Sequence, residues 1–192
     1  SFNAKKDEQN QKFTFTKFSE KFHFENIVVK DQIKEFLLGN DFDAFESFEG
    51  AQSLEKVIFG KKITTIGNNS FRDCSKLETI NFILESSCNI IGANSFQNCI
   101  SLNKIYFPNS ITTIGNDCFK DCINLNSLIL SNNLTSIGYS AFKNTDIIES
   151  SFIKLDYLGY QAFQNCSSLK TVTFDNLCTI TTFNYSTFEN CE

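Results

Sequence analysis

The sequence predicts a β-rich solenoid of right-handed coils, with short parallel strands, short helical or 3-10 turns and an N-terminal cap. Two observations predict this fold. A pattern of apolar, glycine and cysteine positions recurs along most of the chain, with copies about two dozen residues apart. In the clearest copy, the apolar Ile80 and Phe82 flank the polar Asn81, as in a short strand with one buried face.

The repeat reads Ile-x-x-Ile-Gly-x-x-x-Phe-x-x-Cys-x-x-Leu-x-x-Ile-x-Phe and is clearest over residues 63–82. Its phenylalanine recurs every 21 to 25 residues, at Phe48, Phe71, Phe96, Phe119, Phe142, Phe163 and Phe188. This period lies within the ~20–29 residues of leucine-rich repeats. A single coil of this size cannot bury its own apolar residues, so we expect each coil to be stabilised by its neighbours.

Three regions follow one another along the chain. Residues 1–12 are polar and charged, and we expect a flexible lead-in. Residues 13–47 should form a cap over the first coil, with strand-like alternation at 13–15 and 22–24 and a helix-like segment from Asp31 to Gly39. Residues 48–192 should form the leucine-rich-repeat solenoid, with about six coils of which the last is incomplete.

Each repeat predicts two short extended segments, Leu-x-x-Ile-x-Phe and Ile-x-x-Ile-Gly, with the phenylalanine between them in the core. The residue between the last two apolar positions of the first segment should point outward. In successive copies this residue is Ile58, Asn81, Tyr106, Ile129, Phe152 and Thr173. Four of the six are apolar or aromatic, which favours a partner-binding surface with Lys104 beside it. The alternative is that strand propensity alone selects these residue types.

Residues 137–142 (IGYSAF), 158–163 (LGYQAF) and 119–125 (FKDCINL) carry a family resemblance. They resemble the BspA-like, Treponema pallidum-type class of leucine-rich repeats, whose core reads IxxIGxxAFxxCxxLxxIxxP. The resemblance covers roughly residues 45–192, and it departs from the family because only one copy has its proline, Pro108. It implies a cell-surface or secreted protein of a microbe or protist, such as a surface antigen or a protein of cell adhesion.

The cysteines follow the repeat. Five of the eight occupy one column, Cys74, Cys99, Cys122, Cys166 and Cys191. Ala51 and Thr145 fill the same column in other copies, which indicates a small buried residue and favours free thiols. Stacked equivalents can also lie within disulfide distance, so the disulfide alternative stays open. A zinc site is not expected, because Cys118 and Cys122 have no second ligand pair.

Composition excludes several classes of function. The net charge of −5 disfavours nucleic acid as a partner, and no apolar run reaches the ~18 residues of a membrane span. His23 is the single histidine, and the chain has no phosphate-binding loop, serine nucleophile motif or calcium loop. We therefore expect no catalytic residue, no cofactor and no metal site, and hence not an enzyme.

Two hypotheses about function remain. The first is a non-catalytic protein-interaction module that binds a protein or glycan through its strand face, at the cell surface or secreted. The second is an intracellular structural or scaffold subunit of a larger assembly, cytoplasmic or cytoskeletal. The second hypothesis is favoured by thiol-like cysteines, by the lack of a visible signal peptide and by a last coil without its own cap.

Overall fold

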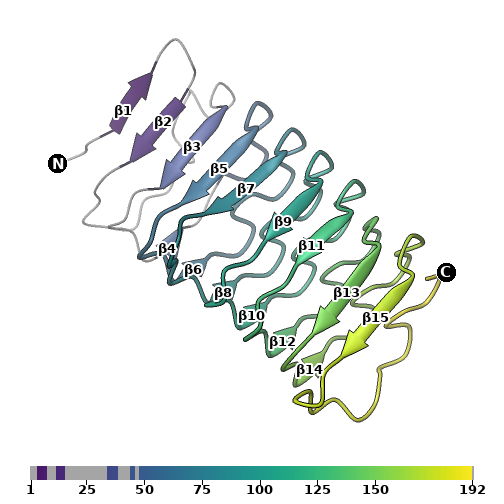
Figure 1. Cartoon of the computed structure of the whole chain (residues 1–192). Coiled ribbons are helices and arrows are strands. Elements are labelled where there is room, and N and C mark those ends of the chain that lie inside the picture. Colours follow the sequence, from purple (N-terminus) through teal and green to yellow (C-terminus); the bar gives the residue numbers. More distant parts are fainter. Residues whose placement is uncertain (1–3, 8–11, 16–33, 39–43, 46–47, 192) are drawn as a thin grey trace.

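The computed structural model describes residues 4–7, 12–15, 34–38, 44–45 and 48–191 of the chain. In this part of the chain the backbone winds into a β-solenoid of about six turns, and two rows of short strands run along the stack (Figure 1). The described residues contain no helix. The solenoid predicted from the repeat is therefore confirmed.

The first row is a seven-stranded sheet with the order β1-β2-β3-β5-β7-β9-β11. Its strands are β1 (Ala4–Asp7), β2 (Lys12–Phe15), β3 (Glu35–Leu38), β5 (Lys56–Phe59), β7 (Thr79–Phe82), β9 (Lys104–Tyr106) and β11 (Ser127–Ile129). Neighbouring strands are parallel except β1 and β2, which are antiparallel. In line with this sheet, β13 (Glu149–Phe152) and β15 (Thr171–Phe174) form a parallel pair (Figure 1).

The second row is a six-stranded sheet of two-residue strands with the order β14-β12-β10-β8-β6-β4. These strands are β4 (Ala44–Phe45), β6 (Thr65–Ile66), β8 (Ile90–Ile91), β10 (Thr113–Ile114), β12 (Ser136–Ile137) and β14 (Tyr157–Leu158). All of their pairings are parallel. Except for β4, they belong to the Ile-x-x-Ile-Gly segments of the repeat, and each of the five coils from β3 to β12 contributes one strand to each row.

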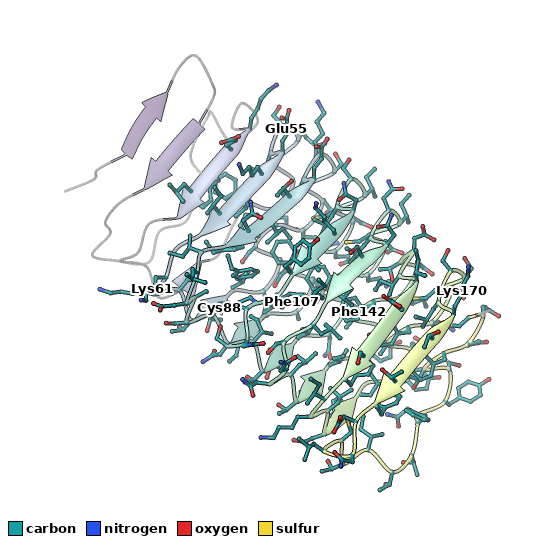
Figure 2. The ribbon with its side chains drawn as sticks, in the orientation of Figure 1. Glu55, Lys61, Cys88, Phe107, Phe142 and Lys170 are labelled. Carbon is teal, nitrogen blue, oxygen red and sulfur yellow. The ribbon has the colours of Figure 1, made fainter. Side chains whose placement is uncertain are left out.

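A stack of phenylalanine rings fills the space between the two rows. Ring centroids lie 5.2 Å apart between Phe71 and Phe96, 5.3 Å between Phe96 and Phe119, and 5.4 Å between Phe119 and Phe142. The two rings of each pair are nearly parallel. These rings are fully buried. Figure 2 shows Phe107 and Phe142 among the side chains that lie between the rows of strands. The repeat's phenylalanine is therefore the core residue that the sequence predicted.

The N-terminal region differs from the prediction in two places. Residues 35–38 form strand β3 between β2 and β5 instead of part of a helix from Asp31 to Gly39. Pairing with two neighbouring strands satisfies the backbone hydrogen bonds of β3. It also buries Phe36, whose ring centroid lies 4.5 Å from that of Phe48, and these interactions override the local helix signals. Ala4–Asp7 forms β1 inside the expected lead-in, since backbone pairing needs no apolar side chain. The strand expected at 13–15 is confirmed within β2.

The connections between the glycine and cysteine columns are turns, where short helical or 3-10 turns were expected. Asn69 and Asp73 both adopt left-handed backbone angles, with φ values of 58° and 60°, and equivalent residues do so in later coils. A left-handed residue interrupts a right-handed helix. Alternate backbone N–H groups of this turn bond to the next coil instead, as Phe71 does by donating to the Ser95 carbonyl oxygen at 2.7 Å, whereas Arg72 donates back to Asn69 within the turn.

Candidate functional site

The outward face of the first row brings together three residues that the sequence singled out. Tyr106 in β9 and Ile129 in β11 are paired neighbours, and their side chains are 50% and 53% exposed. Lys104 is also exposed, and its ammonium nitrogen lies 5.9 Å from the centroid of the Tyr106 ring. A cation over an exposed aromatic ring contributes about 0.5–1 kcal/mol. We call these three residues the strand-face patch.

The remaining members of the predicted column lie on both sides of this patch. Asn81 in β7 is exposed and pairs with Ile58 in β5, which is only half-buried. Thr173 in β15 is exposed and pairs with Ser151 of β13. The column is therefore apolar and half-exposed at its centre, in Tyr106 and Ile129, and polar toward the C-terminal end.

Phe152 is a correction to the predicted column. Its side chain is only 3% exposed, it pairs with Phe174, and its ring stands edge-on to the core ring of Phe163 at 6.1 Å. This coil has one residue fewer between Thr145 and the following apolar position, which is Ile147. Because strand side chains alternate, a shift of one residue exchanges the two faces. Ser151, not Phe152, is the outward residue of β13.

Sequence reasoning missed three further exposed isoleucines near the patch. Ile100 and Ile123 directly follow the buried cysteine column in the turns before β9 and β11, and they are 41% and 55% exposed. Ile148 precedes β13 and is 46% exposed. The sequence does distinguish Ile100 and Ile123, because other coils have a polar residue at that position, namely Ser75, Asp146 or Ser167. The coils of β9 and β11 therefore expose apolar groups both on the strands and at the turns before them.

The charged groups of the strand face are distributed unevenly. On the N-terminal side, Lys34 lies 3.3 Å from Glu55, and Lys56 lies 3.9 Å from Glu35. All four side chains are more than a third exposed, so each pair contributes at most about 1 kcal/mol. Within the described residues, Lys104 forms no ion pair. The strand-face patch thus offers one cation beside two apolar groups.

The cysteines are all free thiols. Cys99 donates to the carbonyl oxygen of Phe71 at 3.2 Å and Cys122 to that of Phe96 at 3.1 Å, so each thiol bonds to the preceding coil. Burial raises the pKa of Cys88 to about 12 and that of Cys166 to about 11, which keeps both protonated and weakly nucleophilic near neutral pH. All four thiols pack the core, and those of Cys99, Cys122 and Cys166 also bond to the preceding coil, whereas Cys88 bonds to Ile90 of its own coil.

The described part of the chain gives little support for catalytic or metal-binding chemistry. The described residues hold no group of three or more histidine, cysteine or acidic side chains placed to bind a metal ion. His23, the single histidine, lies outside the described residues, as does the segment 22–24. Among the described residues, no helix is long and apolar enough to cross a membrane. The strand-face patch is therefore the best-defined candidate site.

Comparison with known proteins identifies the repeat. The family model described as "BspA type Leucine rich repeat region (6 copies)" matches residues 11–90, 44–154 and 89–192. The solved structure of the T. pallidum Leucine Rich Repeat protein is 25% identical and has a TM-score of 0.66. That match covers 93% of this chain and 80% of the other. No curated protein matches the sequence.

Two further solved structures share the fold at lower identity. A leucine-rich cell surface protein of Faecalibacterium prausnitzii is 19% identical with a TM-score of 0.55, and the match covers 91% of this chain and 53% of that one. The pneumococcal vaccine antigen PcpA is 20% identical with a TM-score of 0.63, and the match covers 92% of this chain and 48% of that one. The chain thus spans about half the length of these two proteins.

Proposed function

Because the chain belongs to the family of BspA-type leucine-rich-repeat proteins, we propose that it is a non-catalytic module that binds a protein or a glycan through its strand-face patch. Two proteins of similar fold are a bacterial cell-surface protein and a vaccine antigen, and this likeness supports a place at the cell surface. Adhesion to another cell, through a protein or a glycan on it, is the role that we assign to the module.

The main support for this proposal is the pairing of Tyr106 with Ile129 on adjacent strands, where each side chain is about half exposed. Aromatic residues at the centre of a surface, surrounded by polar ones, are typical of positions that dominate binding energy. The backbone at both residues is fixed by parallel pairing, so little conformational entropy is lost when a partner binds. Lys104 adds a charged group that can orient an acidic or carbonyl-bearing partner.

A second candidate function is supported by the thiols. All eight cysteines are unpaired, although extracellular proteins of this size often use disulfides. This observation favours an intracellular scaffold subunit. Thiol titration of the unfolded native protein, together with mapping of attached glycans, separates the two candidates. Eight titratable thiols without glycans would favour the scaffold, and mapped disulfides or glycans would favour the cell surface.

The test of the proposed function measures binding of the fluorescently labelled chain to cultured cells. We expect the double substitution Tyr106→Ser with Ile129→Ser to weaken binding by at least about tenfold, since each hot-spot residue typically contributes 2 kcal/mol or more, roughly 30-fold. The matched control is Leu84→Ser with Leu177→Ser, which removes two other side chains that are 88% and 58% exposed.

The control variant should bind like the unmodified chain. Cells stripped with protease should lose binding if the partner is a protein, and periodate-treated cells should lose it if the partner is a glycan. Equal binding by both double variants would overturn the assignment of the site to the strand face, provided that both keep the far-ultraviolet circular dichroism spectrum of the unmodified chain.

A further inference from the structure

Three exposed tyrosines stack on one another along the C-terminal half of the solenoid. Tyr139, Tyr160 and Tyr185 occupy one repeat position, directly after the glycine column, on three successive coils. Ring centroids lie 5.6 Å apart between Tyr139 and Tyr160, which are nearly parallel at 6°, and 6.1 Å apart between Tyr160 and Tyr185. The three side chains are 40%, 36% and 77% exposed. They form a ladder of phenols at the surface.

The glycine column explains why these rings must meet. A Cβ atom added to Gly159 would lie 2.5 Å from the backbone nitrogen of Tyr139, so the backbones of the two coils touch at this point. Side chains that follow the glycines on adjacent coils are therefore held at close distance. On the other side of Tyr139 the same column holds Asn116, whose Oδ1 accepts a hydrogen bond from the Tyr139 backbone N–H at 2.9 Å.

The phenols are also held in place by a polar contact. The Tyr139 hydroxyl donates to Oε1 of Gln161 at 2.7 Å, and Gln161 directly follows Tyr160. The chain has five tyrosines, and the other two, Tyr106 and Tyr157, are 50% and 53% exposed. Within the described residues, neither of these two stacks on another aromatic ring. Exposure is thus common to all five, whereas close packing of phenols is confined to the ladder.

We propose that Tyr139 and Tyr160 form a site of oxidative cross-linking, at which hydrogen peroxide and a haem peroxidase join the two rings as dityrosine. Each phenol gives up one electron and its hydroxyl proton and becomes a phenoxyl radical. The radicals join through a new carbon–carbon bond ortho to each oxygen, and the two ring hydrogens at these carbons pass to the oxygens. The peroxide takes up two electrons and two protons and leaves as two water molecules.

The closeness of the two rings favours a cross-link within one chain over a cross-link between molecules. Two rings on one chain have an effective concentration of at least about millimolar, whereas separate molecules at micromolar concentration meet on the order of 10³-fold less often. Both rings are more than a third exposed, so an oxidant reaches them and they can turn to bring their ortho carbons together. The cross-link ties two coils across a loop of 21 residues, since Tyr139 and Tyr160 are 21 positions apart.

Trypsin places Tyr139 and Tyr160 in different peptides, so the cross-link joins two peptides. Cleavage after lysine places Tyr139 in peptide 121–143 and Tyr160 in peptide 155–170, which also holds Tyr157. The full chain is treated with a haem peroxidase and hydrogen peroxide at micromolar concentration and then digested. After reduction of any disulfide between Cys122 and Cys166, we expect one main joined peptide, 121–143 with 155–170, lighter by two hydrogen atoms than the sum of its reduced parts and showing dityrosine fluorescence.

Substitutions by phenylalanine keep a ring in the ladder but remove the oxidisable phenol. Tyr160→Phe should reduce the joined peptide at least about tenfold, whereas Tyr106→Phe and Tyr157→Phe should leave its yield unchanged. The same treatment in denaturant should abolish the preference for this pair. Absence of the joined peptide from the folded chain, its persistence in Tyr160→Phe, or a main product that links tyrosines of two molecules would each overturn the proposal.

Discussion

The buried phenylalanine stack yields the most demanding prediction, which is that Phe119→Ala destabilises the solenoid strongly. The Phe119 side chain is fully buried, and its ring lies 5.3 Å from Phe96 and 5.4 Å from Phe142. Phe107 adds an edge-on contact at 5.8 Å. Removing a buried phenylalanine ring costs about 3–5 kcal/mol, and stacked aromatic pairs contribute about 0.5–1.5 kcal/mol beyond burial. Because the rings on both sides lose a stacking partner, we expect the free energy of unfolding to fall by about 4–5 kcal/mol.

Urea unfolding followed by far-ultraviolet circular dichroism measures this loss. Tyr106→Ala is the matched control, because Tyr106 is an aromatic residue in the strand of the preceding coil with half of its side chain exposed. Its substitution should change the free energy of unfolding by less than about 1 kcal/mol. A loss below about 1 kcal/mol for Phe119→Ala, or equal losses for both variants, would refute the assignment of the stack to the core.

Two further predictions concern register and thiols. Phe152→Ser should cost about 3 kcal/mol or more, whereas Ser151→Phe, on the exposed side of β13, should stay within about 0.5 kcal/mol; equal urea midpoints would contradict the register. The pKa of Cys88 is raised to about 12 and that of Cys166 to about 11, against about 8.5 when unfolded. The contribution of these two thiols to the free energy of unfolding should therefore be constant below pH ~8.5 and fall as pH rises toward the folded values. In Cys88→Ala with Cys166→Ala, urea unfolding at several pH values above about 9 should show a shallower fall, and an unchanged slope would contradict it.

The repeat made most of the fold predictable because stacking imposes the same demand on every coil. A ring at Phe71 packs well only if the next coil places a ring at the same height, so a single column of phenylalanines determines the period. The cysteine column was predictable for a similar reason, since the coils from Ala51 to Cys166 each place a small buried residue at this position, and Cys99 and Cys122 donate there to backbone carbonyls of the preceding coil. In both columns the buried environment dictates the residue type.

The failures have equally local causes. Residues 35–38 carry helix-like signals, and pairing with β2 and β5, residues distant in sequence, decides their conformation. At Phe152 the coil is shorter by one residue before its strand, and only the pairing with Phe174 reveals the change of face. The exposed isoleucines Ile100 and Ile123 were missed because they lie in turns, outside the strands from which the outward column was predicted. Sequence spacing alone contains none of these long-range pairings.

The outward columns are where the coils differ, and this difference bears on the origin of the strand-face patch. If strand propensity alone selected the outward residues, β-branched or aromatic residues would fill the whole column. Asn81 and Ser151 occupy it as well; asparagine is depleted in strands, and serine is neither β-branched nor aromatic. Tyr106 and Ile129 fall on two adjacent coils, together with the exposed Ile100 and Ile123 of the same coils. Single exposed apolar residues are ordinary. A group of four on two neighbouring coils, two of them paired across adjacent strands, supports the proposed partner-binding surface.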